Sequence, residues 1–115
     1  MSSRRLSRMG EEIKKLVSNL IMNEVKDPRV SPMTSVIQVE VTRDLRYAKI
    51  YISVMGTEKE KQDTLAGLNS SKGFIRKEIG QKINMRYTPE PIFELDSSID
   101  HGIRISEMLR DINKE

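Results

Sequence analysis

Apolar residues near the start of the chain recur at the three- and four-residue spacing of one helix face. The stripe consists of Leu6, Met9, Ile13, Leu16, Val17, Leu20 and Ile21, and charged or polar residues fill the gaps. This pattern predicts an amphipathic helix that begins within residues 3–7 and ends near residues 25–26. Pro28 ends it, because the residue before a proline avoids the helical region. Residues 27–32, with two prolines, then form a stiff connector.

Two alternating stretches follow the connector and predict strands with one buried face. In residues 35–42 the inward side chains are Ile37, Val39 and Val41. In residues 47–55 they are Ala48, Ile50, Ile52 and Val54. A short turn at residues 43–46 makes the pair an antiparallel hairpin. Its outer face carries Tyr47, Lys49 and Tyr51, which face either solvent or a partner.

A broken helical segment comes next. Thr57 begins it, and Glu60, three residues later, completes a capping box. Residues 69–71 read Asn-Ser-Ser, which favours caps over helix interiors. Gly73 allows a sharp turn or a close approach of the backbone to another group. Ile75, Ile79 and Ile83 then mark one face of a new helix, so we predict a helix, a small-residue break and a second helix.

The last third of the chain completes an α+β fold. Pro89 and Pro91 make residues 86–91 extended, and residues 92–95 form a short strand. Asp96 or Ser97 caps a last helix whose apolar stripe is Ile99, Ile103, Leu109 and Ile112. The order is α-β-β-α-α-β-α, with the second helical element kinked. We expect a three-stranded sheet with helices packed on one face, in one domain that spans residues 1–115.

Charge is distributed unevenly along these 115 residues, although the net charge is only +3. Residues 1–20 carry five lysines and arginines against two acids, residues 72–86 carry five against one, and residues 87–100 carry four acids and no lysine or arginine. Such a distribution suits a polyanion on one side of the molecule, although any single lysine is commonly just solvated surface. The chain has no cysteine, no apolar run long enough to span a bilayer and no apolar signal core, so we expect a cytoplasmic protein.

Catalytic and metal-binding chemistry finds little support. The chain lacks a cysteine nucleophile, and its one histidine, His101, has the setting of a surface residue. Asp96 and Asp100 fit helix capping better than acid–base catalysis. No phosphate-cradling glycine loop is present. We therefore expect no enzyme activity, no catalytic or metal site, no cofactor and no small-molecule substrate.

Nucleic-acid binding fits the charge pattern better. Aromatic residues make up only 4% of the chain, so contacts should go mainly to phosphate and ribose rather than to stacked bases. Positive charge gathers in the N-terminal helix, in the hairpin turn, and at the helix break with the helix that follows. The candidate RNA-binding residues are Arg4, Arg5, Arg8, Arg43, Arg46, Ser71, Lys72, Gly73, Arg76, Lys77, Lys82 and Arg86.

Four segments of the chain, in their order and spacing, resemble the bacterial ribosome-binding factor A family. They are residues 27–29, 39–51, 73–76 and 86–96. The order of elements likewise resembles the type II KH fold. This resemblance implies a cytoplasmic factor that binds free 30S subunits late in maturation, is needed for efficient 16S rRNA processing, acts in cold adaptation and has no known enzymatic activity. The family has an Ala-x-Gly kink where this chain has Ser71-Lys72-Gly73. Serine is small enough for the kink, and it is also able to cap the second helix.

Two other functions stay open at this point. One is a general KH-type protein that binds RNA or DNA without a preference for the ribosome. The other is a protein-interaction module whose basic surface meets an acidic partner, with no direct RNA contact. In the favoured interpretation the protein, expected to be a monomer, clamps a folded element of 16S rRNA and favours one of its conformers.

Overall fold

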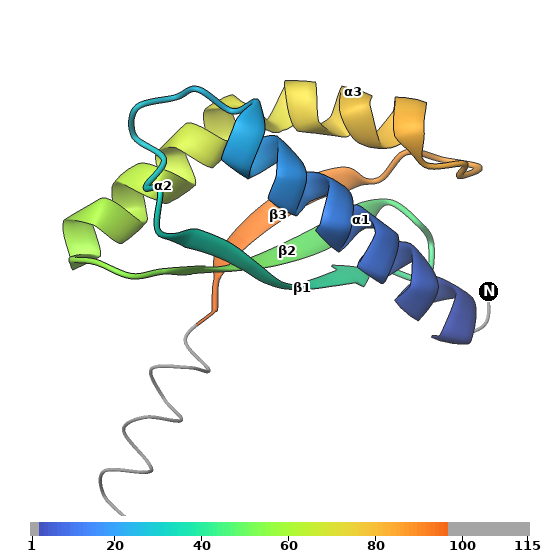
Figure 1. Cartoon of the computed structure of the whole chain (residues 1–115). Coiled ribbons are helices and arrows are strands. Elements are labelled where there is room, and N and C mark those ends of the chain that lie inside the picture. The colour runs from blue at the N-terminus through green and yellow to red at the C-terminus, as the bar shows by residue number, and fades with distance from the viewer. Residues whose placement is uncertain (1–2, 97–115) are drawn as a thin grey trace, which may run out of the picture.

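A sheet covered on one face by helices forms the body of the protein. The structure is a computed structural model that describes residues 3–96. The elements are α1 (Ser3–Asn23), β1 (Thr34–Val41), β2 (Tyr47–Val54), α2 (Glu58–Ser70), α3 (Lys72–Lys82) and β3 (Glu90–Leu95). Figure 1 shows all of these helices on the same side of the sheet, as the sequence predicted. The predicted last helix, with His101, lies outside the described residues.

The sheet has the order β1-β2-β3, with β2 in the middle. β1 and β2 are antiparallel, while β3 runs parallel to β2 because the α2–α3 segment carries the chain back to the other end of the sheet. Ile50 of β2 lies opposite Val39 on one side and Phe93 on the other, and all three are buried. The central strand therefore carries the core, and the start of β2 lies beside the start of β3.

One strand departs from the predicted alternation. The pairing of β1 with β2 shifts between Val36 and Gln38, where a bulge places an extra residue in β1. Val36 is therefore buried, whereas Ile37 is only half-buried. The prediction that Ile37 points inward was wrong, because strict alternation does not hold across a bulge. Val39 and Val41, beyond the bulge, are buried as expected.

Helix α1 packs closely on β1. A Cβ atom on Gly10 would lie 2.5 Å from the backbone oxygen of Val39, so only glycine allows this approach. Ile13, Val17 and Leu20 then fill the core beneath the helix. The helix ends at Asn23, two to three residues earlier than predicted.

No helix within residues 3–96 is long and apolar enough to cross a membrane.

The capping box at the start of α2 is confirmed. The backbone N–H of Glu60 donates to Thr57 Oγ1 at 3.2 Å, and the N–H of Thr57 donates to Glu60 Oε1 at 3.1 Å. These two bonds satisfy donors that the first helical turn otherwise leaves unpaired. The Thr57 N–H and the Thr57 hydroxyl, which both donate to Glu60 Oε1, hold the pKa of the Glu60 carboxyl below its usual range.

Candidate nucleic-acid interface

The break between α2 and α3 is a single residue, Ser71. Its φ of −92° and ψ of 4° take it out of both helices, and its N–H donates to the carbonyls of Leu68 at 3.0 Å and Gly67 at 3.2 Å. Its hydroxyl also donates to the Gly67 carbonyl, at 3.1 Å. The side chain makes no cap bond to α3. The idea that Ser71 caps the second helix was therefore wrong, because the hydroxyl is bonded to the end of the first.

Gly73, two residues later, lies open on the surface. It is exposed, no described glycine has a positive φ, and a Cβ atom added to it would meet nothing within 4 Å. The turn itself therefore does not require glycine. No group of the described chain approaches this position closely either, so the predicted close approach at Gly73 stays a prediction about a group from outside the molecule.

The face of α3 that carries Gly73 is concave. Gly80 lies two turns further along the helix, and a Cβ atom there would be 2.8 Å from Thr88 Oγ1. A shallow depression of about 310 Å³ is lined by Gly73, Arg76, Lys77, Gly80 and Thr88. We call this surface the glycine face. It combines two predicted cations with backbone that no side chain covers at Gly73.

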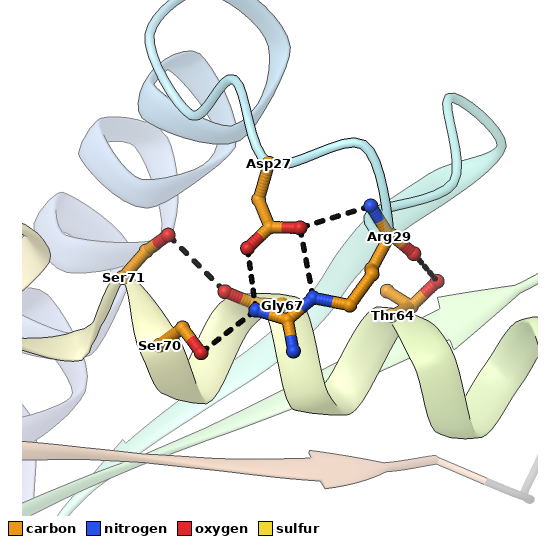
Figure 2. A network of polar contacts seen from close by, with 6 residues as sticks. All are labelled: Asp27, Arg29, Thr64, Gly67, Ser70 and Ser71. Carbon is orange, nitrogen blue, oxygen red and sulfur yellow. Dashed lines mark hydrogen bonds and ion pairs between the residues drawn. The ribbon is translucent and has the colours of Figure 1, made fainter.

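A polar network fixes the end of α2 that leads into the break (Figure 2). Arg29 Nη2 lies 2.7 Å from Asp27 Oδ2 and 2.8 Å from Ser70 Oγ. The Arg29 side chain and backbone N–H lower the pKa of the Asp27 carboxyl to about 2. Gly67 leaves room for this connector, since a Cβ atom there would be 2.8 Å from Val30 Cγ2. The sequence marked residues 27–32 only as a stiff linker and did not reveal this role.

Buried Thr64 provides a second attachment for the same connector. Its hydroxyl accepts from the backbone N–H of Ser31 at 3.1 Å and donates to the Glu60 carbonyl at 2.8 Å. The connector is thus held at Ser31 and at Arg29 along one side of α2. This arrangement positions the helix break relative to α1 and the sheet.

The hairpin turn is shaped by a buried leucine in an unusual conformation. Leu45 has a φ of 62°, in the left-handed region that non-glycine residues rarely adopt, and it is 5% exposed. Asp44 Oδ1 accepts bonds from the Arg46 N–H at 3.1 Å and from Thr42 Oγ1 at 2.8 Å. These bonds lower the pKa of the Asp44 carboxyl. The turn thus directs Leu45 into the core and Arg46 outward.

A cleft of about 610 Å³ lies between this turn, α3 and the chain before β3. We call it the turn cleft, and it is lined by Asp44, Leu45, Arg46, Tyr47, Arg76, Tyr87, Thr88 and Glu90. Arg76 Nη2 donates to the Thr88 carbonyl at 3.3 Å, which holds the arginine over this region. The fold therefore brings together Arg46 and Arg76, which the sequence placed in separate basic segments.

Several predicted cations have partners within the molecule. Lys72 Nζ lies 3.7 Å from Glu90 Oε1, and Lys82 Nζ lies 3.1 Å from Glu78 Oε2. Arg46 Nε is 3.9 Å from Asp44 Oδ2, a weak and exposed pair. Arg86 stacks over the Tyr87 ring at 5.5 Å. Lys72 and Lys82 are thus less available to an external anion than the sequence indicated.

Other predicted cations are exposed along the surface. Lys77 lies on the glycine face, Arg43 is in the hairpin turn, and Arg4, Arg5 and Arg8 are on the first turns of α1. In Figure 1 the start of α1, the hairpin turn and the chain between α3 and β3 all lie at one end of the molecule. Positive charge from three separate segments therefore gathers toward this end.

Tyr87 is the residue that sequence reasoning passed over, whereas Tyr47 was placed on the outer face of the hairpin, where it would face either solvent or a partner. Tyr47 is 38% exposed and Tyr87 is 58% exposed, and both line the turn cleft. A signal was available, because each tyrosine directly follows an arginine, in the pairs Arg46-Tyr47 and Arg86-Tyr87.

Residues 3–96 contain no group of three or more histidine, cysteine, aspartate or glutamate residues placed to hold a metal ion.

Comparison with known proteins identifies related sequences. The family model described as "Ribosome-binding factor A" matches residues 5–109. A ribosome-binding factor A from Caldanaerobacter subterraneus subsp. tengcongensis is 55% identical over 111 residues, which are 96% of this chain and 91% of the relative. The predicted family resemblance is therefore confirmed.

A solved structure and a fitted homology model of related proteins have the same fold. The solution NMR structure of a Thermotoga maritima protein has a TM-score of 0.71 and 32% identity, and the match covers 82% of this chain and 89% of that one. A homology model of the Thermus thermophilus ribosome binding factor A, fitted into a cryo-EM map of a 30S complex, has a TM-score of 0.62 and 17% identity, covering 76% of this chain and 91% of that one. These likenesses confirm the α+β, KH-like fold predicted from the sequence.

Proposed function

Because the chain belongs to the ribosome-binding factor A family, we propose that it binds the free 30S subunit through 16S rRNA and assists late maturation of that subunit. In this proposal it promotes 16S rRNA processing in the cytoplasm without catalysing a reaction, and it acts as a monomer. Residues 1–115 then form one KH-like RNA-binding domain.

The glycine face is the observation that supports this function best. Gly73 leaves backbone uncovered, and Arg76 and Lys77 stand beside it on the same helix. An RNA backbone is a ridge of phosphates that needs a close approach and nearby positive charge. The start of α3 adds a weak preference for anions. Such contacts position a protein on folded RNA without reading its sequence.

Binding would act on the rRNA by selecting one conformer. A factor that has higher affinity for one arrangement of an RNA element shifts the population toward that arrangement. Low temperature slows the exchange between alternative RNA pairings, so this selection would matter most in cold adaptation. The network around Arg29 would contribute by keeping the helix break in one geometry when the RNA docks.

The double variant Arg76→Glu with Lys77→Glu tests the proposal. We expect it to bind purified free 30S subunits more weakly than the parent, with a log–log salt dependence shallower by roughly one unit per phosphate contact removed. A matched control reverses two exposed lysines outside this face, Lys26→Glu with Lys59→Glu, so the net charge changes equally. Parent-like binding by the first variant would rule out the glycine face as the rRNA contact.

Two competition experiments address the other functions. A short single-stranded RNA that displaces the protein as efficiently as 30S subunits do would indicate a general nucleic-acid-binding protein. A partner retained from cell extract after RNase treatment, with no affinity for purified 30S subunits, would indicate a protein-interaction module instead.

A further inference from the structure

The turn cleft has the dimensions of a small-ligand site. Its volume of about 610 Å³ falls within the range of roughly 300–1,000 Å³ that is usual for such pockets. Its walls combine buried Leu45 and the rings of Tyr47 and Tyr87 with polar groups from Arg46, Arg76 and Thr88. Flat apolar surface beside a few hydrogen-bonding groups is the setting that a heteroaromatic ring requires.

Aromatic side chains are concentrated here. The chain has five aromatic residues, and two of them line this cleft with their rings partly open to solvent. The Arg86 guanidinium lies 5.5 Å from the Tyr87 ring centroid, which restrains that ring through a cation–π contact. A restrained, exposed ring favours stacking, because the side chain loses little conformational entropy when a base stacks on it.

The charge of the lining argues against a simple phosphate site. Arg46 and Arg76 are balanced by the carboxylates of Asp44 and Glu90, and Glu90 is itself paired with Lys72. A phosphate in the cleft would meet these acids. The edge of a nucleobase presents both donors and acceptors, so it matches a lining that offers both.

The turn cleft is continuous with the proposed backbone contact. Arg76 and Thr88 line both the cleft and the glycine face. A strand whose phosphates follow α3 would therefore bring a nucleotide to the mouth of the cleft. Unpaired nucleotides in RNA loops and bulges turn their bases out in this way.

We propose that the turn cleft binds one unpaired base of the rRNA, stacked on Tyr87, while the adjacent backbone lies on the glycine face. This inference rests on the proposed function and adds to it a contact with a single nucleotide. It also adds one base contact to the expectation that contacts go mainly to phosphate and ribose, because the fold brings two of the few aromatic residues into one site.

The test compares Tyr87→Leu with Tyr87→Phe in binding to free 30S subunits. Leucine removes the stacking ring, and we expect affinity to fall by about 5- to 150-fold, the range measured for single base–aromatic contacts. Phenylalanine keeps the ring and should bind like the parent. The salt dependence should stay unchanged in both variants, since neither removes a charge. Tyr51→Leu, the same change on the outer face of β2, is the matched control and should bind like the parent.

Each outcome bears on a different claim. If Tyr87→Leu binds as tightly as the parent while the Arg76→Glu, Lys77→Glu variant is weakened, the base site is overturned and the proposed function stands. If Tyr51→Leu loses as much affinity as Tyr87→Leu, the loss is not specific to the cleft and the inference also fails. If the parent itself does not bind 30S subunits, the proposed function fails and the inference fails with it.

A titration with free nucleotides identifies the source of the base. The four nucleoside monophosphates are added to the full chain labelled with ¹⁵N, and backbone amides of residues 42–48 and 86–90 are followed by NMR. We expect weak binding, in the millimolar range or weaker, that Tyr87→Leu abolishes, since an isolated base lacks the backbone contacts. Micromolar affinity for one mononucleotide would assign the cleft to a free nucleotide and overturn the rRNA inference.

Discussion

Arg29 Nη2 donates to the Ser70 hydroxyl at 2.8 Å, which joins the connector after α1 to the last residue of α2 across 41 positions of the chain. The same nitrogen lies 2.7 Å from Asp27 Oδ2. One guanidinium therefore secures the connector to itself and to the helix that leads into the break. The geometry of a surface proposed to meet RNA thus depends on a residue that need not touch RNA.

Replacing Arg29 by lysine should loosen this attachment although the charge is kept. A lysine ammonium lacks the planar, forked donor set that bonds Asp27 and Ser70 together. We expect faster amide hydrogen exchange at residues 67–71, with little change in the central strand. Exchange measured by NMR on Arg29→Lys and the parent checks this. Unchanged exchange at Ser71 would show that the bond between Ser31 and Thr64 suffices to hold the connector.

Acid should weaken the same network in a defined pH window. The pKa of Asp27 is lowered to about 2 from an ordinary value of 3.8, so its contribution to stability is complete above pH 3.8 and is lost as the pH falls toward 2. Asp27→Asn should therefore differ from the parent by a constant free energy of unfolding near neutral pH. That difference should shrink between pH 3.8 and 2 in denaturant titrations. The pKa values of the Asp44 and Glu60 carboxyls are also lowered. Both residues are present in the parent and in the variant, so their contributions cancel in the difference between the two free energies of unfolding.

Thr57→Ala should destabilise the protein by about 1 kcal/mol, because it removes the side-chain oxygen that caps α2. Thr57→Ser keeps that oxygen and serves as the matched control. Urea denaturation of the two variants and the parent gives the comparison. Equal stability of the alanine and serine variants would indicate that the cap bond contributes nothing measurable to this helix.

Alanine should have opposite effects on stability at two helical glycines. At Gly73 the added Cβ meets open space, so Gly73→Ala should stabilise the protein by about 0.5–1 kcal/mol. At Gly10 it would lie 2.5 Å from a backbone oxygen, so Gly10→Ala should destabilise the protein by about 1–3 kcal/mol. Thermal melts of both variants check these signs.

The same Gly73→Ala variant should bind 30S subunits more weakly despite its greater stability, because the methyl group stands where the RNA backbone is proposed to approach. Measuring both the affinity of the variant for 30S subunits and its melting temperature separates the effect on binding from the effect on stability. A more stable variant with parent-like affinity would mean that no close contact forms at Gly73.

Local patterns in the sequence predicted the elements of this fold well. The alternation in residues 47–55 is confirmed as β2 with Ala48, Ile50, Ile52 and Val54 inward, and the Thr57–Glu60 capping box is present. The break at residues 69–73 also lies where the small residues indicated. Each of these features depends on interactions between residues that are close together in the chain. The pattern of neighbouring residues is therefore enough to predict it.

Tertiary structure decided how those elements meet. The bulge that excludes Ile37 from the core depends on pairing with β2, and the attachment of Ser70 at the end of α2 depends on Arg29, 41 positions away. The turn cleft needs Arg46, Arg76 and Tyr87 from three segments, and the sequence gives no local sign that they converge. Periodicity and capping are set by near neighbours along the chain, whereas a site is set by distances between segments that only the packed core establishes.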